Sequence, residues 1–138
     1  MSAVIDHMRK VPLFRGMPTS ALETVADRAT ETTFDDGETV TREGEPGETF
    51  YIVTDGRLHV TQHGTLIREL GPGDFLGEIS LIDGGPRTAT VTADGPVQAL
   101  VIRRADFLEM VEWDSAVRLG VLTALTERIR KTAPEEVD

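Results

Sequence analysis

Turn-forming dipeptides divide the middle of the chain into short stretches rich in Thr, Val, Ile and Phe. Between residues 32 and 102 these turn signals recur roughly every ten residues, a spacing typical of short strands in an all-β sandwich, roll or barrel. They are Asp36-Gly37, Pro46-Gly47, Asp55-Gly56, His63-Gly64, Gly71-Pro72-Gly73 and Asp94-Gly95. The strongest hairpin signal is Asp55-Gly56, which predicts a tight turn joining strands at 50–54 and 58–62.

Helical periodicity marks both ends of the chain. Apolar residues at 4, 8 and 11 follow helical spacing until Pro12, and Pro18-Thr19-Ser20 with Glu23 predicts a capped helix to about residue 29. After residue 103 the pattern predicts a helix over 105–112, then a longer one capped by Ser115 and ending near residue 131. Trp113, between these two helices, is expected to anchor a helix against the strands.

We therefore expect a mainly β fold with flanking α-helices, built as one domain over residues 1–131. The β-roll, of the double-stranded β-helix or jelly-roll kind, is predicted at 32–103. An N-terminal helical segment precedes it at 1–31, and two C-terminal helices follow at 104–131. The acidic tail at 132–138 is expected to be mobile.

Composition excludes several classes of protein. The chain has 138 residues, no cysteine and a net charge of −10, so disulfide frameworks and thiolate-bound zinc or iron–sulfur clusters are excluded. The acidity argues against direct nucleic-acid binding. No apolar run approaches the ~20 residues that cross a bilayer, and no signal peptide is visible, so we expect a cytoplasmic protein without membrane contact. Three scattered histidines indicate neither a metal site nor haem.

The stretch FLGEISLIDGGPRTATV, residues 75–91, combines groups suited to a small phosphate anion that carries a ribose. Arg87 can present a planar donor fork to two phosphate oxygens. Backbone N–H groups of a short helical turn from Glu78–Ile79 would point at the same anion. The ionised Glu78 can only accept hydrogen bonds, so it would bind a sugar hydroxyl. A solvated arginine at the start of a strand is the simpler reading of Arg87, and its setting after Pro86 favours the ligand.

Gly77-Glu78 and Pro86-Arg87-Thr88-Ala89 resemble the phosphate-binding cassette of the cyclic nucleotide-binding domain family. The resemblance extends from residue 11 to the helix near residue 105. It implies a cyclic nucleotide ligand, with Arg87 on the phosphate and Glu78 on the ribose 2′-hydroxyl. The remaining cassette residues that it implies around the ligand are Gly77 beside the ribose, Ile79, Ser80 and Ala89 as backbone donors, and Thr88.

Thr88 bears on the identity of the base. In the family a hydroxyl at this position reaches both the phosphate and the amino group of a syn guanine, yet members with threonine also bind cyclic AMP. We expect cyclic AMP, with cyclic GMP left open. Val60, Ile67 and Leu70 fall where the family contacts the purine, although strand residues of this kind also form core. The large apolar residues assigned to the core are Phe50, Phe75 and Leu81.

Leu122, Leu125 and Ile129 recur at helical spacing on the last helix. Three uses remain open for them. They can dock the helix on the roll, which is the default, form the seam of a homodimer, or cap the purine. The resemblance implies the cap, with Leu125 and Ile129 over the base.

The predicted function is that of a stand-alone cyclic nucleotide sensor that changes conformation and signals to a separate effector protein. No catalytic residues are visible, so no enzyme activity and no cofactor are expected. One alternative is a degenerate β-roll that binds no nucleotide and serves as a protein-interaction scaffold. A small metal-dependent β-roll enzyme is a second alternative, although the sequence lacks its His-x-His and carboxylate ligands.

Overall fold

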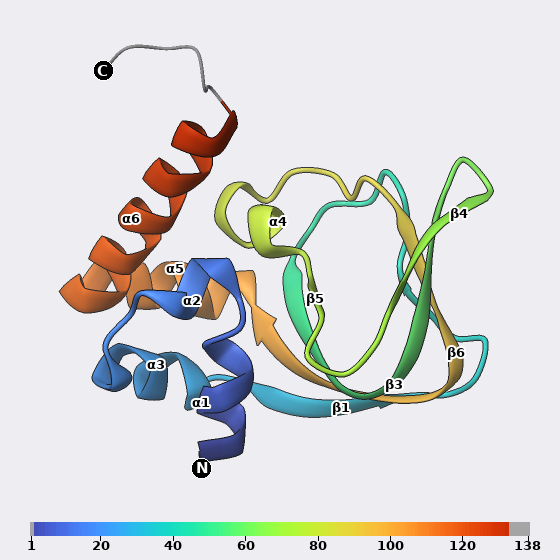
Figure 1. Ribbon diagram of the computed structural model, residues 1–138, viewed down its shortest axis with the longest axis horizontal. Helices are drawn as coiled ribbons and strands as arrows, with labels where there is room; N and C mark the ends of the chain where they lie inside the picture. The colour runs from blue at the N-terminus through green and yellow to red at the C-terminus, as the bar shows by residue number, and fades with distance from the viewer. Residues whose placement is uncertain (1, 133–138) are drawn as a thin grey trace.

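A computed structural model of the chain describes residues 2–132. Residues 133–138 of the predicted acidic tail lie outside the described residues, and so do a few side chains within helices, including those of Glu78 and Ile79. Within the described chain, helices gather at one end of a rolled sheet (Figure 1). The helices are α1 Ser2–Met8, α2 Pro12–Arg15, α3 Thr19–Ala26, α4 Glu78–Asp83, α5 Arg104–Trp113 and α6 Ser115–Thr132. The strands are β1 Thr30–Phe34, β2 Thr39–Thr41, β3 Thr49–Gln62, β4 Thr65–Leu70, β5 Phe75–Leu76 and β6 Thr90–Arg103.

Two long antiparallel strands, β3 and β6, form the centre of the sheet. Its order is β1-β6-β3-β4, with β2 added to β6 and β5 added to β3. This is the predicted β-roll with flanking helices, and its first strand begins at Thr30. None of the described helices is long and apolar enough to cross a membrane.

The predicted hairpin at Asp55-Gly56 is wrong. Residues 49–62 form one continuous strand, β3, whose register against β6 shifts between Val53 and Asp55 and again between Asp55 and Arg57. Gly56 has a φ of 94°, and the facing Gly95 in β6 has a φ of 86°. Both Asp-Gly pairs therefore bend the two strands together at a corner of the roll, as β-bulges do.

Two helix starts also differ from the prediction. Pro18 occupies the N-cap position of α3, and no side chain caps this helix. At α6 the capping side chain belongs to Asp114 rather than Ser115, because Asp114 Oδ1 accepts hydrogen bonds from the N–H groups of Ala116 and Val117 at 3.0 and 3.1 Å. Pro12 does not end α1, which already ends at Met8, but begins α2, as proline does at the first position of a helix.

The core has two parts. One lies where the helices meet the end of the roll and includes Phe14, whose ring makes edge contacts with Phe50 and Phe107. The other fills the roll around Val53, Leu58 and Val97. As predicted, Phe50 and Leu81 are buried.

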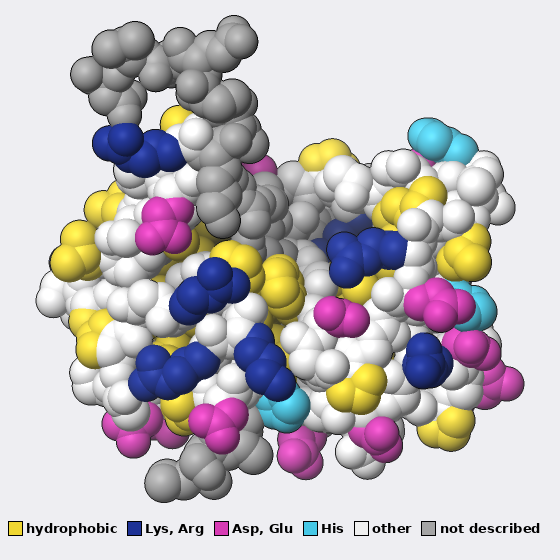
Figure 2. Space-filling view, in the orientation of Figure 1, with side chains coloured by type: hydrophobic (Ala, Val, Ile, Leu, Met, Phe, Trp, Pro, Cys, Tyr) yellow, Lys and Arg dark blue, Asp and Glu magenta, His cyan; other side chains and the backbone are white. Residues whose placement is uncertain are grey.

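Trp113 does not anchor a helix against the roll, because its side chain is 58% exposed. It is the last residue of α5, whose buried residues are Phe107 and Met110. Hydrophobic side chains are visible on the side of the molecule formed by α5 and α6 (Figure 2). The exposed large apolar residues of these two helices are Leu108, Trp113, Leu119, Leu122 and Ile129.

Candidate functional site

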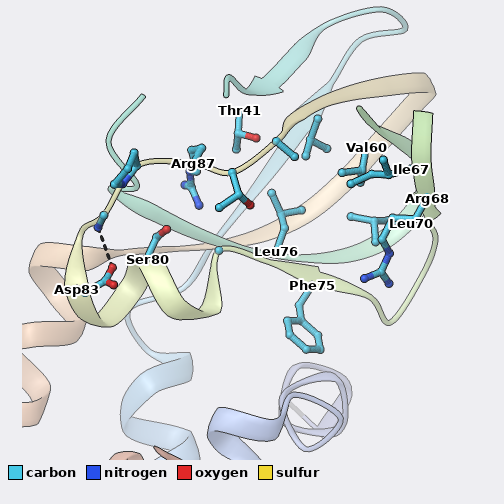
Figure 3. Close-up of a pocket in the computed structure, with 16 residues that line it drawn as sticks. Thr41, Val60, Ile67, Arg68, Leu70, Phe75, Leu76, Ser80, Asp83 and Arg87 are labelled. Atoms are coloured by element: carbon cyan, nitrogen blue, oxygen red, sulfur yellow. Dashed lines mark hydrogen bonds between the residues drawn. The ribbon is translucent and has the colours of Figure 1, made fainter. Parts of the chain in front are cut away.

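A cavity of about 710 Å³ opens between α4 and the strands of the roll. Its size falls in the usual range for small-ligand pockets. Most of the predicted ligand residues line it, namely Val60, Ile67, Leu70, Gly77, Ser80, Arg87, Thr88 and Ala89. In Figure 3 the labelled polar residues Arg87, Ser80 and Thr41 lie toward one end, and Val60, Ile67 and Leu70 lie toward the other. The cavity is therefore polar at one end and mainly apolar at the other.

Arg87 is the single buried charged residue among the side chains that the structure describes, with 9% exposure. Its Nη2 donates to the carbonyl oxygen of Thr49 at 2.5 Å and to Thr49 Oγ1 at 3.1 Å. Burial lowers the pKa of the guanidinium, and the nearby Tyr51 and Glu48 oppose this shift. Because burial of a charge is costly without compensation, an anion in the cavity would stabilise this arrangement.

The loop before β3 holds the backbone at Arg87. The N–H of Arg87 donates to the carbonyl of Glu45 at 2.7 Å, and its own carbonyl accepts from the N–H of Gly44 at 2.8 Å. Gly47 donates to the carbonyl of Gly85 at 3.0 Å, and a Cβ on Gly47 would collide with Ser80. Gly44 and Gly47 thus help to fix the position of Arg87 and bring the loop against α4.

Gly77 and α4 complete the polar end. Gly77 is the N-cap of α4 and has a φ of 89°, in the left-handed region that favours glycine. The backbone of Glu78 and Ile79 begins α4, but their side chains lie outside the described part of the chain. The predicted contact of Glu78 with a ribose therefore remains a prediction.

The apolar end is formed by β3 and β4. Val60 and Leu70 are 8% and 3% exposed and belong to the core of the roll, whereas Ile67 is 50% exposed. The register of β3 against β4 shifts after Val60, so that Val60 faces Arg68 and the next residue faces Leu66. Because of this bulge, the adjacent residues Ile67 and Arg68 both line the cavity, which simple alternation along a strand does not predict.

Sequence reasoning missed several lining residues. They are Thr41, Arg68, Phe75, Leu76, Asp83, Gly85, Pro86 and Val91. Phe75, assigned to the core, also packs on the helical part of the core, so it has both roles. Gly85 and Pro86 could have been predicted as lining residues, because they come immediately before Arg87 in the stretch at residues 75–91.

The two residues expected to cap a base are not among those lining the cavity. Leu125 packs against the core of the helical end, and Ile129 is 63% exposed. Figure 1 shows α6 on the side of α4 away from the strands. In this conformation α6 packs on α2, α3 and α5, so a role over the base requires the helix to move.

The histidines lie apart from the cavity lining. His59 Nε2 is 3.4 Å from Glu69 Oε2 and 3.1 Å from Asp94 Oδ2, and His63 Nδ1 is 3.3 Å from Glu43 Oε2. Within the described residues, no group of three or more His, Cys, Asp or Glu side chains is arranged to hold a metal ion.

Residues 31–114 match the model of the cyclic nucleotide-binding domain family. The chain therefore belongs to this family, and a cavity with a buried arginine at its polar end can accept a small anionic ligand. The family is regulatory rather than catalytic, and the relatives below include regulators of kinases and of transcription.

Three similar proteins illustrate the kinds of regulator in which this domain occurs. The chain is 36% identical over 110 residues to the cAMP-dependent protein kinase regulatory subunit of Dictyostelium discoideum, covering 74% of this chain and 34% of that protein. It is also 36% identical over 115 residues to the cGMP-dependent protein kinase, isozyme 2 forms cD5/T2, of Drosophila melanogaster, covering 77% and 12%. The N-terminal domain of a transcriptional regulator from Streptomyces coelicolor A3(2) superposes with a TM-score of 0.87 at 31% identity, covering 96% and 99%.

Proposed function

We propose that this domain binds a 3′,5′-cyclic purine nucleotide in the cavity and acts as a sensor for it. The phosphate would bind Arg87, the ribose would bind Glu78, and the base would lie toward Val60, Ile67 and Leu70. The observation that carries the proposal is the buried guanidinium of Arg87 at the polar end of a cavity of about 710 Å³. The domain spans only 34% and 12% of the two kinase-related proteins, so a signalling role beyond binding is part of the proposal.

The chemistry of the phosphate end supports an anionic ligand. Thr49 holds one terminal nitrogen of Arg87 through two acceptors, so the guanidinium is oriented before a ligand arrives. A ligand that meets an oriented donor loses less conformational entropy on binding. A phosphate would also supply the anionic partner that the buried guanidinium of Arg87 needs, and the hydrogen bonds between the two groups would be charge-assisted.

The chemistry of the base end leaves two nucleotides. The apolar residues can contact either purine, and cyclic AMP is the ligand that we propose first. Arg68 favours cyclic GMP as a second candidate, because it lines the cavity close to Leu70 and carries only donors (Figure 3). Guanine presents the acceptors O6 and N7, whereas adenine presents a donor at N6.

Signalling would pass through the C-terminal helices to a separate effector protein. Nucleotide binding would draw α4 toward the phosphate and shift the packing of α5 and α6 at the helical end. A ligand moves such an equilibrium only by its preference for one state, and a near-complete switch needs a preference of about 5.5 kcal/mol. A homodimer through the exposed face of α6 is a further part of this proposal.

Isothermal titration calorimetry with cyclic AMP and cyclic GMP tests the binding. We expect saturable binding to the wild-type domain, and a loss of at least about 100-fold in Arg87→Ala, because a charge-assisted contact disappears. Arg87→Lys should also bind weakly, because lysine lacks the planar fork. Arg103→Ala, at an exposed position in the same domain, is the matched control and should bind as the wild type does.

Thermal unfolding without ligand checks that each variant is folded. If neither nucleotide releases heat nor raises the Tm of the wild-type domain at millimolar concentration, the sensor proposal is wrong. A protein-interaction scaffold would then be the better reading.

A further inference from the structure

Arg104 connects α5 to the end of α4. It is the first residue of α5, and its Nη2 donates to the carbonyl oxygen of Ile82 at 3.0 Å. Ile82 is the second-last residue of α4, where carbonyl groups have no partner within the helix. A cation is also favoured at this end of a helix. A side chain of α5 therefore caps the short helix that borders the nucleotide cavity.

Gly84 gives the guanidinium its space. Gly84 follows α4 with a φ of 66°, and a Cβ built there would lie 2.9 Å from Cζ and 3.0 Å from Nε of Arg104. The side chain of Arg104 thus packs directly on the backbone that joins α4 to Gly85 and Arg87. A displacement of this backbone toward α5 would press on the guanidinium.

The main chain of Arg104 is held separately. The N–H of Arg104 donates to the carbonyl of Glu48 at 2.9 Å. The N–H of Gly47, the residue before Glu48, donates to the carbonyl of Gly85 at 3.0 Å. The backbone of Arg104 is thus hydrogen-bonded to the loop before β3, while its guanidinium is hydrogen-bonded to α4. A movement of α4 relative to that loop would bend the Arg104 side chain, move α5, or break the hydrogen bond to Ile82.

One donor of Arg104 has no acceptor in the part of the chain that the structure describes. Its Nε is buried and makes no hydrogen bond there. A buried donor without a partner costs free energy, so a shift of α4 that brought one of its terminal carbonyl groups to Nε would gain a hydrogen bond.

We propose that Arg104 is the positioning residue that transmits nucleotide binding from α4 to α5 and α6. This inference rests on the proposed function, because it needs a ligand that draws α4 toward Arg87. The role of Arg104 is mechanical, because it does not line the cavity in which we propose that the nucleotide binds. Removing its guanidinium should leave binding largely intact and weaken the response of the C-terminal helices.

Hydrogen exchange with and without cyclic AMP tests this, alongside calorimetry on the same proteins. In the wild type we expect nucleotide to change amide exchange in both 77–89 and 104–130. Arg104→Met keeps the aliphatic stem, and its nucleotide affinity should stay within about tenfold of wild type, a modest coupling effect. Its change in 77–89 should persist, while the change in 104–130 falls to less than half. Arg103→Met, at the adjacent exposed position, should respond as the wild type does.

The outcomes separate this inference from the proposed function. If Arg104→Met keeps the full change in 104–130, or if the wild type binds nucleotide and changes only 77–89, the coupling through Arg104 is wrong and the binding stands. If the wild type binds neither cyclic nucleotide by calorimetry, the proposed function fails and the coupling fails with it. Should Arg104→Met not fold, Arg104→Lys and Gly84→Ala decide by the same exchange pattern, because each disturbs the guanidinium at Ile82 in a different way.

Discussion

The guanidinium of Arg87 occupies the space in which a side chain of residue 77 would begin. A Cβ built on Gly77 would collide with Arg87 Nη1 and would lie 2.8 Å from the carbonyl oxygen of Thr49. That same carbonyl accepts a hydrogen bond from Arg87 Nη2. Glycine at position 77 is therefore needed for the arginine to reach its position, in addition to any approach of a ribose.

Gly77→Ala should weaken nucleotide binding by about tenfold or more, because the added methyl displaces the guanidinium that would bind the phosphate. Gly64→Ala is the matched control. Gly64 also has a positive φ, 81°, but no atom lies within 4 Å of a Cβ added there. Both variants carry the left-handed backbone cost of about 1–2 kcal/mol, so a difference between them in calorimetric affinity reports the methyl group added beside Arg87 rather than the backbone cost. Equal affinities in the two variants would contradict the explanation.

Ile67 and Leu70 allow ligand contact to be separated from core packing. Ile67 is 50% exposed and Leu70 is 3% exposed, although both line the cavity. Ile67→Ala should weaken cyclic nucleotide binding by about fivefold, or about 1 kcal/mol, while the free energy of unfolding changes by less than about 0.5 kcal/mol. Leu70→Ala should lower the free energy of unfolding by about 2–5 kcal/mol.

Titration calorimetry and urea denaturation on the same two variants check this pair. Loss of affinity in Ile67→Ala with unchanged stability supports a base contact. If Ile67→Ala binds as tightly as the wild type, the purine does not reach β4.

The polar end of the site could be predicted from sequence because its determinants are local. Gly77 and Arg87 lie within one short stretch, residues 75–91, and the setting of Arg87 directly after Pro86 favours a ligand over a solvated side chain. The turn spacing likewise indicated the β-roll, since strand lengths are set by where the chain can turn.

The errors arise where a distant segment decides the outcome. Asp55-Gly56 fits a hairpin turn and a strand corner equally well, because both need a positive φ, and only pairing with β6 distinguishes them. Arg68 was missed because the bulge opposite Val60 places consecutive residues at the cavity. Trp113 is exposed because α5 packs on the helical core through Phe107 and Met110, and segments distant in the sequence decide which face of α5 is buried.

Neighbouring residues of α6 should differ sharply in their contribution to stability. Val121 is 6% exposed and packs in the core of the helical end, whereas Leu122 is 57% exposed. Val121→Ala should lower the free energy of unfolding by about 2 kcal/mol, because it leaves a cavity. Leu122→Ala should change it by less than about 0.5 kcal/mol. Urea denaturation measures both, and a large loss in Leu122→Ala would mean that this face of α6 is covered in solution.

The corner of the roll gives the sharpest test of the strand geometry. A Cβ on Gly56 would collide with the carbonyl oxygen of Pro96 and lie 2.9 Å from the Cα of Val97, whereas nothing lies within 4 Å of a Cβ on Gly95. Both glycines have a positive φ, so alanine at either position carries the left-handed cost of about 1–2 kcal/mol. Gly56→Ala must also push β6 away from the corner, and we expect a further loss of about 1–3 kcal/mol. Urea denaturation of the two variants should therefore give the lower midpoint for Gly56→Ala, and equal midpoints would mean that the two strands do not meet at this corner as described.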